Sequence, residues 1–195
     1  MERVTVDTSA AALADALAGH RTALEAIEGL SDDLGWAADI IAHAFAEGGR
    51  LLVCGNGGSA ADAQHIVAEF VGRYLKERAP YSAIALSTNT SALTAIGNDY
   101  GFDEVFARQV RAHGRPGDVL LAISTSGTSP NVLAAVAAAR EADMKVIVLS
   151  GRDGGTLIDD CDVSLVVPVD STPRIQEMHI LLAHVLCGLV EDALS

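Results

Sequence analysis

Apolar and polar positions along this chain follow two spacings, one typical of buried strands and one typical of helices. Short, nearly unbroken apolar runs occupy residues 51–54, 83–86, 119–123, 146–149 and 163–167. Between these runs, apolar residues recur at the three- to four-residue spacing of an amphipathic helix. Strands that alternate with helices in this way predict βαβ units, a parallel sheet and helices on both of its faces. The predicted fold class is therefore α/β, with ligands bound beyond the carboxyl ends of the strands.

Two helical patterns precede the first apolar run and make up an N-terminal helical segment over residues 1–48. The first is rich in alanine, and its expected N-cap is Thr8 or Ser9. The second begins near Ser31 and ends at the glycine pair Gly48–Gly49. We expect this segment to serve in packing against the sheet and in oligomerisation.

The last segment, from Pro173 to Leu194, has the pattern of a long helix with proline in its first turn. Apolar residues surround this helix on nearly every side, which predicts that it is buried. At the end of the chain, the expected cover of such a helix is another subunit.

Composition limits the classes of protein to which the chain can belong. A length of 195 residues suits one hydrophobic core, so we expect a single domain over residues 1–195. Half of the residues are hydrophobic and a fifth are charged, which excludes a disordered chain and suggests more burial than a monomer provides. The formal net charge of −13 would repel a phosphate backbone, so neither nucleic acid nor an anionic membrane is an expected partner.

The three cysteines, Cys54, Cys161 and Cys187, form no C-x-x-C pair. Their odd number and wide spacing argue against a disulfide framework and against a cysteine zinc site, and fit a reduced cytosol. The sequence begins without a basic-then-apolar signal segment, and none of its apolar runs reaches the length of a membrane span. We therefore expect a cytoplasmic protein.

A glycine-rich loop, Gly55-Asn56-Gly57-Gly58-Ser59, follows the first predicted strand. Glycine lets the backbone turn sharply and approach a ligand closely. We expect Ser59 to cap the helix that follows. The free N–H groups and the positive dipole end of that helix favour an anion such as a phosphate.

A serine-rich loop, Ser124-Thr125-Ser126-Gly127-Thr128-Ser129-Pro130, follows the third predicted strand and leads into another helix. Its hydroxyl and amide donors can cradle a phosphate without any Lys or Arg. An ordinary serine-rich turn is the competing interpretation. The loop is neither a Walker loop nor a dinucleotide-binding loop, because the G-K-[ST] and G-x-G-x-x-G spacings are missing.

Between these two loops, Gly97-Asn98-Asp99-Tyr100-Gly101 is predicted to interrupt two helical segments. Asn98 and Asp99 suit the binding of sugar hydroxyls. An Asn-Asp pair beside glycine is more often a simple turn. The residues alone leave both interpretations open.

A set of nitrogen and oxygen ligands for a divalent metal is spread over two predicted helices. His65 and Glu69 lie four residues apart and so share one helix face. Gln176 and His184 belong to the last helix, about 12 Å apart along its axis, so they either reach toward each other or come from different chains. Imidazole and carboxylate ligands make zinc the first choice of metal. A satisfied core histidine is the competing interpretation of His65, His179 or His184 taken singly.

Four stretches read G-N-G-G-S-A-A-D-A-Q-H, A-I-G-N-D-Y-G-F, A-I-S-T-S-G-T-S and R-I-Q-E-M-H-I-L-L-A-H. In combination they resemble the bacterial phosphoheptose isomerases, or sedoheptulose 7-phosphate isomerases, of the sugar isomerase (SIS) fold. The resemblance runs from about residue 48 to the C-terminus. It implies a three-layer αβα sandwich around a five-stranded parallel sheet, and a homotetramer with active sites at the subunit interfaces.

The resemblance also implies a reaction, the conversion of sedoheptulose 7-phosphate to D-glycero-D-manno-heptose 7-phosphate, which is the first step toward activated heptose. Glu69 and His184 would be the acid/base pair. One zinc ion per subunit would have His65, Glu69, Gln176 and His184 as ligands. The residues that would hold the sugar phosphate are Asn56, Gly57, Gly58, Ser59, Glu69, Asn98, Asp99, Ser124, Thr125, Ser126, Ser129 and Gln176.

These residue types suit the implied chemistry. Moving a carbonyl from C2 to C1 requires that a proton leave one carbon, that an enediol form, and that a proton return to the other carbon. A carboxylate such as Glu69 can shuttle that proton, and an imidazole such as His184 can exchange protons with the two oxygens. A metal would stabilise the enediolate oxygen as a Lewis acid.

Two other functions compete with this one. A non-enzymatic relative binds the replication initiator DnaA. It keeps much of the G-N-G-G-S and R-I-Q-E-M-H sequence but lacks the catalytic glutamate and the second histidine. Both are present here, as Glu69 and His184, which favours an enzyme over a phosphosugar-binding or DnaA-binding regulator. Another aldose–ketose isomerase, such as one for a pentose phosphate, is disfavoured by the phrase R-I-Q-E-x-H-x-x-x-x-H.

Overall fold

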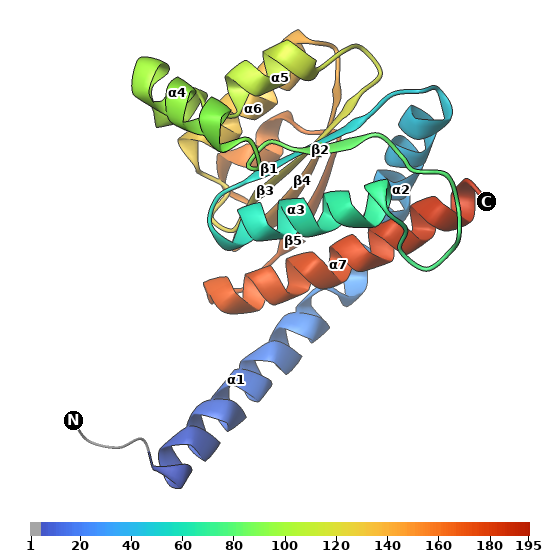
Figure 1. The fold of residues 1–195 in the computed structure, drawn as a ribbon. Coiled ribbons are helices and arrows are strands. Elements are labelled where there is room, and N and C mark those ends of the chain that lie inside the picture. Colours follow the sequence, from blue (N-terminus) through green and yellow to red (C-terminus); the bar gives the residue numbers. More distant parts are fainter. Residues whose placement is uncertain (1–4) are drawn as a thin grey trace.

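The computed structural model describes residues 5–195, in which five parallel strands form one sheet in the order β2-β1-β3-β4-β5 (Figure 1). Each strand coincides with one of the five apolar runs, so the predicted parallel sheet is confirmed. The strands are β1 (Leu51–Gly55), β2 (Ala83–Ala85), β3 (Val119–Ser124), β4 (Lys145–Gly151) and β5 (Val163–Val167).

Helices connect the strands and cover the sheet on both sides (Figure 1). Three short 3₁₀ helices lie at Glu28–Leu30, Phe102–Glu104 and Gly155–Asp160. The α-helices are α1 (Val6–Ala26), α2 (Ser31–Ala46), α3 (Gly58–Val71), α4 (Thr90–Tyr100), α5 (Ala107–His113), α6 (Pro130–Glu141) and α7 (Thr172–Ala193).

Alternation along the buried strands divides the core into two clusters, one on each face of the sheet. In β1, Leu51 and Val53 pack with α2, α3 and α7, whereas Leu52 and Cys54 pack with α5 and α6. The helix α4 also packs on the second face, through partly buried Leu93 and Ile96. The result is the three-layer αβα arrangement, with α3 and α7 side by side in one outer layer (Figure 1).

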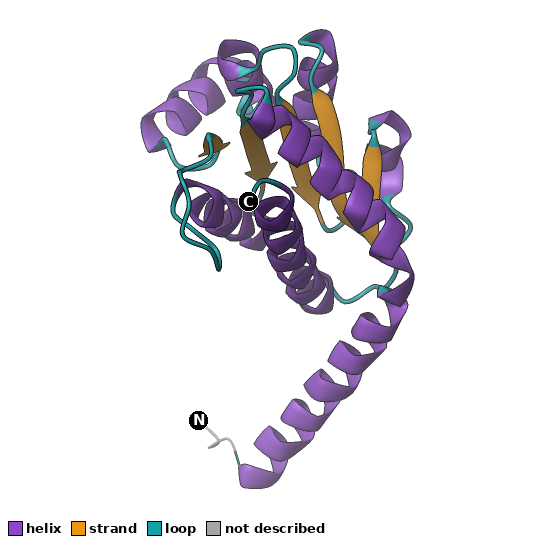
Figure 2. Cartoon of the chain, turned by 90° about the vertical axis from the view of Figure 1, so that its right-hand side faces the viewer, coloured by secondary structure: helices purple, strands orange, loops and turns teal. Residues whose placement is uncertain are grey.

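Helix α1 extends away from the sheet and its covering helices (Figures 1 and 2). Its buried residue, Ala23, lies close to the end that joins the body, while Leu13 and Leu17 are exposed. The N-cap is Thr5, whose side chain accepts a hydrogen bond from the backbone N–H of Thr8, so the expected cap at Thr8 or Ser9 is wrong by one turn. The helical spacing of apolar residues such as Leu13 and Leu17 indicated packing, but a single chain leaves these two side chains uncovered.

Helix α7 has the predicted length and begins with Pro173 in its first turn. A single chain buries it on one side only, and the predicted cover by another subunit stays a prediction. One side packs against the sheet, but Leu181, Val185 and Leu189 form an exposed apolar stripe along the other, each with about two fifths of its surface accessible. The stripe follows from the four-residue spacing of these three side chains, which places them on one face.

A carboxylate near the amino ends of β4 and β5 makes the fold sensitive to acid. Asp162 accepts hydrogen bonds from the Lys145 ammonium at 2.8 Å, the Val146 backbone N–H at 2.8 Å and the Arg140 guanidinium at 2.6 Å. Burial raises the pKa of Asp162, but these donors outweigh burial and hold its pKa below the usual range. Its stabilising contribution is therefore present above the unfolded-state pKa of about 4 and is lost as the pH falls through the lower folded-state pKa.

We expect Asp162→Asn to lower the free energy of unfolding at pH 7 by about 1–3 kcal/mol, because charged hydrogen bonds are lost. The loss should shrink below pH 4, where the wild-type carboxyl also becomes protonated. Urea unfolding at pH 7 and pH 3 checks this, with exposed Asp159→Asn as the matched control. An equal loss at both pH values would contradict the assignment.

Candidate active site

The strand order creates a crevice at the carboxyl ends of β1 and β3, which are neighbours in the sheet. The chain leaves β1 toward one face, where α3 lies, and leaves β3 toward the opposite face, where α6 lies. In open parallel sheets, ligands bind where neighbouring connections diverge in this way. Both loops that the sequence singled out, after β1 and after β3, therefore meet at this crevice.

The glycine-rich loop enters α3 differently from the prediction. The N-cap is Gly57, with φ +55°, and Ser59 lies within the first helical turn and is 3% exposed. Ser59 packs beneath Gly55, where an added Cβ would stand 2.8 Å from the Cβ of Ser59. The positive φ of Gly57 and this close approach explain why Ser59 is inside the helix rather than its cap.

A small polar cavity of about 60 Å³ lies between the two loops and the start of α7. The Ser124 and Ser129 hydroxyl oxygens stand 3.0 Å apart in the serine-rich loop. Every side chain that lines the cavity is uncharged, so an anion there would be held by hydroxyl, amide and helix N-terminal donors. The lining residues are Asn56, Ser59, Ile123, Ser124, Thr125, Ser129 and Gln176.

Asn131, which no sequence pattern singled out, fixes the orientation of Asn56. The two amides form a reciprocal pair: Asn56 Nδ2 donates to Asn131 Oδ1 at 2.8 Å, and Asn131 Nδ2 donates to Asn56 Oδ1 at 2.9 Å. Asn131 is 2% exposed and lies in the first turn of α6. Its position directly after the Ser-Pro start of a helix, where polar side chains gather, is the signal that could have found it.

Gln176 reaches the cavity because Gly58 has no side chain. A Cβ at Gly58 would stand 2.3 Å from Nε2 of Gln176. Gly58 opens α3 and lies seven residues before His65, which is about 10 Å along the helix axis. Within one chain, the amide of Gln176 therefore belongs with the polar cavity, two helical turns from the imidazole of His65.

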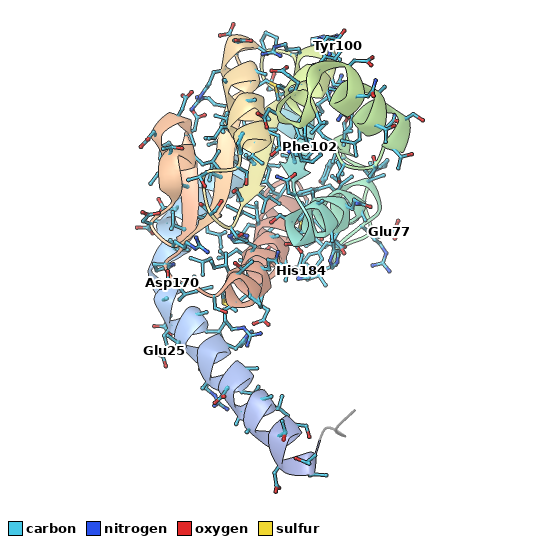
Figure 3. All side chains as sticks on the ribbon, turned by 90° about the vertical axis from the view of Figure 1, so that its left-hand side faces the viewer. Glu25, Glu77, Tyr100, Phe102, Asp170 and His184 are labelled. Carbon is cyan, nitrogen blue, oxygen red and sulfur yellow. The ribbon has the colours of Figure 1, made fainter. Side chains whose placement is uncertain are left out.

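The second part of the site is a cluster formed by His65, Glu69 and His184, where α3 runs beside α7. Figure 3 shows the place of His184 in the molecule. His65 Nε2 is 3.1 Å from Glu69 Oε1 and 3.5 Å from His184 Nε2. One ligand atom from each residue lies within 4.8 Å of the others, and the His65 side chain is 48% exposed. Two imidazoles and a carboxylate open to solvent can hold a divalent cation that a small molecule can also reach.

Other residues of the predicted site lie elsewhere in the chain. Asn98 and Asp99 are helical residues at the end of α4, and Asn98 Nδ2 donates a hydrogen bond to Asp99 Oδ1 at 2.8 Å. The predicted turn is confined to Gly101, with φ +91°. Within the described part of the chain, neither lines the polar cavity nor belongs to the cluster. Ser126 faces a larger neighbouring cavity of about 480 Å³, although its hydroxyl is 3.4 Å from that of Ser124.

His179 has the structural role that is usual for a buried histidine. Its Nε2 is 3.0 Å from the backbone oxygen of Ser150, and its surface is fully buried. Burial lowers the pKa of His179 to about 4, against the opposing effect of the hydrogen bond to Ser150. The imidazole is therefore neutral at physiological pH and takes part in the core.

Known proteins share this architecture and sequence. The SIS domain family model matches residues 17–151. A phosphoheptose isomerase of Rhodospirillum rubrum is 61% identical over 158 residues, which cover 81% of this chain and 84% of the relative. The chain belongs to the phosphoheptose isomerase family.

Two solved phosphoheptose isomerases have the same fold as this member of the family. The one from Neisseria gonorrhoeae is 49% identical, with a TM-score of 0.85 over 95% of this chain and 98% of that chain. The one from Francisella tularensis is 39% identical, with a TM-score of 0.91 over 95% of this chain and 99% of that chain. The predicted resemblance and the SIS fold class are confirmed.

Proposed function

We propose that this chain converts sedoheptulose 7-phosphate to D-glycero-D-manno-heptose 7-phosphate, the first step toward activated heptose. The observation that carries the proposal is the meeting of Glu69 and His184 from two helices, beside a polar cavity suited to a phosphate. The cavity and the cluster are separated by about two turns of α3. That separation suits a substrate whose phosphate and reacting carbons lie at opposite ends of a chain of several carbons.

The reaction is an internal redox exchange that needs no co-reactant. Glu69 takes a proton from C1 of the ketose, an enediol forms, and Glu69 returns the proton to C2. His184 donates a proton to the oxygen on C2 and accepts one from the oxygen on C1, which becomes the aldehyde oxygen. Both side chains reach the same small volume, as a transfer between adjacent carbons requires.

We propose zinc, one ion per subunit, as the metal of the cluster. Two imidazoles and a carboxylate fit its preferred ligands, and the resemblance adds Gln176. When bound, the ion supplies Lewis-acid stabilisation of the enediolate oxygen. Because Glu69 and His184 cannot hold the ion tightly and also move protons, we infer that substrate displaces a ligand or that the metal assists without being essential.

Removing one imidazole should weaken zinc binding. We expect His65→Asn to reduce zinc affinity at least about tenfold, because a nitrogen ligand is lost and the remaining donors are too few. Isothermal titration of metal-stripped protein with zinc measures the effect. His43→Asn, at an exposed position on α2, is the control. Equal zinc affinity in both variants would rule out this cluster as the zinc site.

Turnover in heavy water tests the proposed reaction directly. The purified, zinc-supplemented protein is incubated with sedoheptulose 7-phosphate in D₂O, and the sugar is followed by proton NMR. We expect an aldoheptose phosphate that carries deuterium at C2, because the enediol exchanges its proton with solvent. A product without deuterium would exclude exchange through the enediol, and no turnover at all would favour another phosphosugar or a binding protein.

We further propose that the chain is one SIS domain over residues 1–195, of which residues 1–4 lie outside the described part, and that it assembles as a cytoplasmic homotetramer with sites at the interfaces. Leu13 and Leu17 on α1 and the exposed stripe on α7 support the assembly, since solvent otherwise meets these side chains. Within residues 5–195, none of the helices combines the length and apolar character needed to cross a membrane. Light scattering at several protein concentrations tests the tetramer.

A further inference from the structure

An aromatic ring stacks on the imidazole of His184. Tyr74 and His184 have ring centroids 5.5 Å apart and planes inclined by 8°. The Tyr74 ring extends along α7 to Gly188, where an added Cβ would meet its Cε1 at 3.6 Å. The imidazole of His65 meets His184 from another direction, at 5.0 Å and nearly perpendicular. The plane of the His184 ring is thus defined by Tyr74 against its face and by His65 at a right angle.

Tyr74 belongs to the 72–82 segment, which connects α3 to β2 and passes over the C-terminal half of α7 (Figure 1). A buried carboxylate on α7 holds this segment in place. Glu191, 1% exposed, accepts backbone N–H bonds from Tyr74 at 2.9 Å, Leu75 at 2.9 Å and Lys76 at 3.0 Å. Burial raises the pKa of Glu191, but these three donors and Arg78 outweigh it, so the carboxyl has a lowered pKa and is ionised.

Arg78 connects the same carboxylate to the end of α3. Its Nε donates to Glu191 at 3.0 Å, and its Nη2 donates to the backbone oxygen of Glu69 at 2.7 Å. A further bond joins Nη1 to the backbone oxygen of Phe70 at 2.9 Å, and the guanidinium lies 4.1 Å from the ring centre of Tyr81. The Glu191–Arg78 pair therefore joins the helix that carries Glu69 to the helix that carries His184.

We propose that Tyr74 is a positioning residue for His184, held over the imidazole by Glu191 and Arg78. The proposal rests on the isomerase function proposed above, in which His184 exchanges protons with the two sugar oxygens. Those oxygens sit on adjacent carbons, so proton exchange with both requires a fixed ring plane. The ring of Tyr74 supplies the contact, whereas its hydroxyl has no part in it. Because the phosphate cavity is two helical turns away, losing the ring affects turnover more than substrate binding.

Two substitutions at Tyr74 separate the ring from the hydroxyl. We expect Tyr74→Leu to lower kcat about tenfold with KM changed less than about twofold, because the reacting geometry and not phosphate binding is disturbed. Tyr74→Phe should keep kcat within about twofold of the wild type. Leu75→Ala, at an exposed neighbour in the same segment, is the matched control and should leave both constants unchanged. Equal losses in the Phe and Leu variants, or none in the Leu variant, would overturn the proposal.

Proton NMR of the full-length protein provides a readout that does not depend on activity. At a ring-centre distance of 5.5 Å, the ring protons of His184 lie within reach of the ring current of Tyr74. The His184 resonances, identified by their loss in His184→Gln, should shift in Tyr74→Leu and stay in Tyr74→Phe. Unchanged His184 shifts in the folded Tyr74→Leu protein would show that the ring does not stack on the imidazole and would overturn the proposal. Should the wild type fail to turn over sedoheptulose 7-phosphate, the proposed function would fall while these shifts still decide the stacking.

Non-additivity tests whether Glu191 acts through Tyr74. We expect Glu191→Gln to lower kcat in the wild-type background and to add no further loss in the Tyr74→Leu background, because the ring it holds is already absent. Arg78→Lys, which keeps the charge but loses the forked donors, serves the same test where Glu191→Gln does not fold. If instead the double variant loses kcat by the product of the two single losses, Glu191 acts by another route and this part of the proposal is refuted.

Discussion

Replacing Glu69 with Gln should reduce kcat for sedoheptulose 7-phosphate about a thousandfold, the range expected when a general base loses its proton-accepting group. The amide is nearly isosteric, so packing on α3 and the backbone bond from Arg78 to residue 69 remain. The side chain of Glu69 is largely buried and faces His65 at 3.1 Å, and proton transfer between adjacent carbons needs a carboxylate at this place. Steady-state kinetics and the loss of deuterium incorporation at C2 measure the effect.

Because Glu69 also belongs to the cluster proposed to hold zinc, the same variant must be titrated with zinc. A thousandfold loss of kcat at saturating zinc assigns the loss to proton transfer. A loss that added zinc reverses would assign it to the metal, and unchanged turnover would exclude Glu69 as the base. Glu77→Gln is the matched control, since Glu77 is almost fully exposed and, among the described residues, forms an ion pair only with Arg73, at 3.7 Å in the loop after α3.

Short-range patterns predicted the parts of this molecule that depend on neighbours in sequence. The five strands were found from apolar runs, because strands buried on both faces are continuous in hydrophobicity. The loops after β1 and β3 were found from glycine and serine, whose backbone freedom and hydroxyl groups suit a crevice for an anion. His65 and Glu69 were placed on one helix face by their spacing of four, and the structure has them 3.1 Å apart.

Features that depend on tertiary packing escaped prediction from the residues. The hydrogen-bonded pair of Asn56 and Asn131 joins the loops that follow two neighbouring strands. The pair could not be predicted, because local periodicity does not reveal which strands are neighbours in the sheet. Ser59 looked like a cap because its residue type favours that position, yet its packing under Gly55 places it inside the helix. Glycine and the Asn-Asp pair predicted a turn at 97–101, but α4 continues through Tyr100. Gly97 is accommodated in this helix, where even an added Cβ would only touch Val105 at 3.8 Å.

The candidate site depends both on residue spacing along the chain and on how the helices pack. Family resemblance grouped Gln176 with His184, whereas the single chain places the Gln176 amide against Gly58 and the His184 ring beside His65. Parallel packing of α3 on α7 explains this, since seven residues of one helix match eight of the other. The two helices therefore present two separate polar groups, the Gln176 amide beside the polar cavity and the His65–Glu69–His184 cluster about two turns away.

Replacing Gly127 with Ala should lower the free energy of unfolding by about 3 kcal/mol or more, the largest stability effect that we expect from a single methyl group here. Gly127 has φ +65°, and an added Cβ would stand 1.9 Å from the backbone oxygen of Gly154. The approach is mutual, because a Cβ at Gly155, with φ +57°, would stand 2.6 Å from the backbone oxygen of Gly127. No side-chain rotation relieves a contact between two backbones.

The backbone of Gly127 also accepts the N–H of Leu157 at 3.0 Å, so a shift of the serine-rich loop would break a bond that ties it to the next loop. Ser124 and Ser129 lie on either side of Gly127 in the sequence, and the same substitution should therefore weaken sugar phosphate binding. Urea unfolding at fixed protein concentration measures the stability, with Gly29→Ala as control, since a Cβ at Gly29 meets nothing within 4 Å. If the free energy of unfolding of the Gly127 variant lies within about 0.5 kcal/mol of the wild type, the two loops are not packed backbone to backbone. The packing that we infer to shape the cavity between β1 and β3 would then be absent.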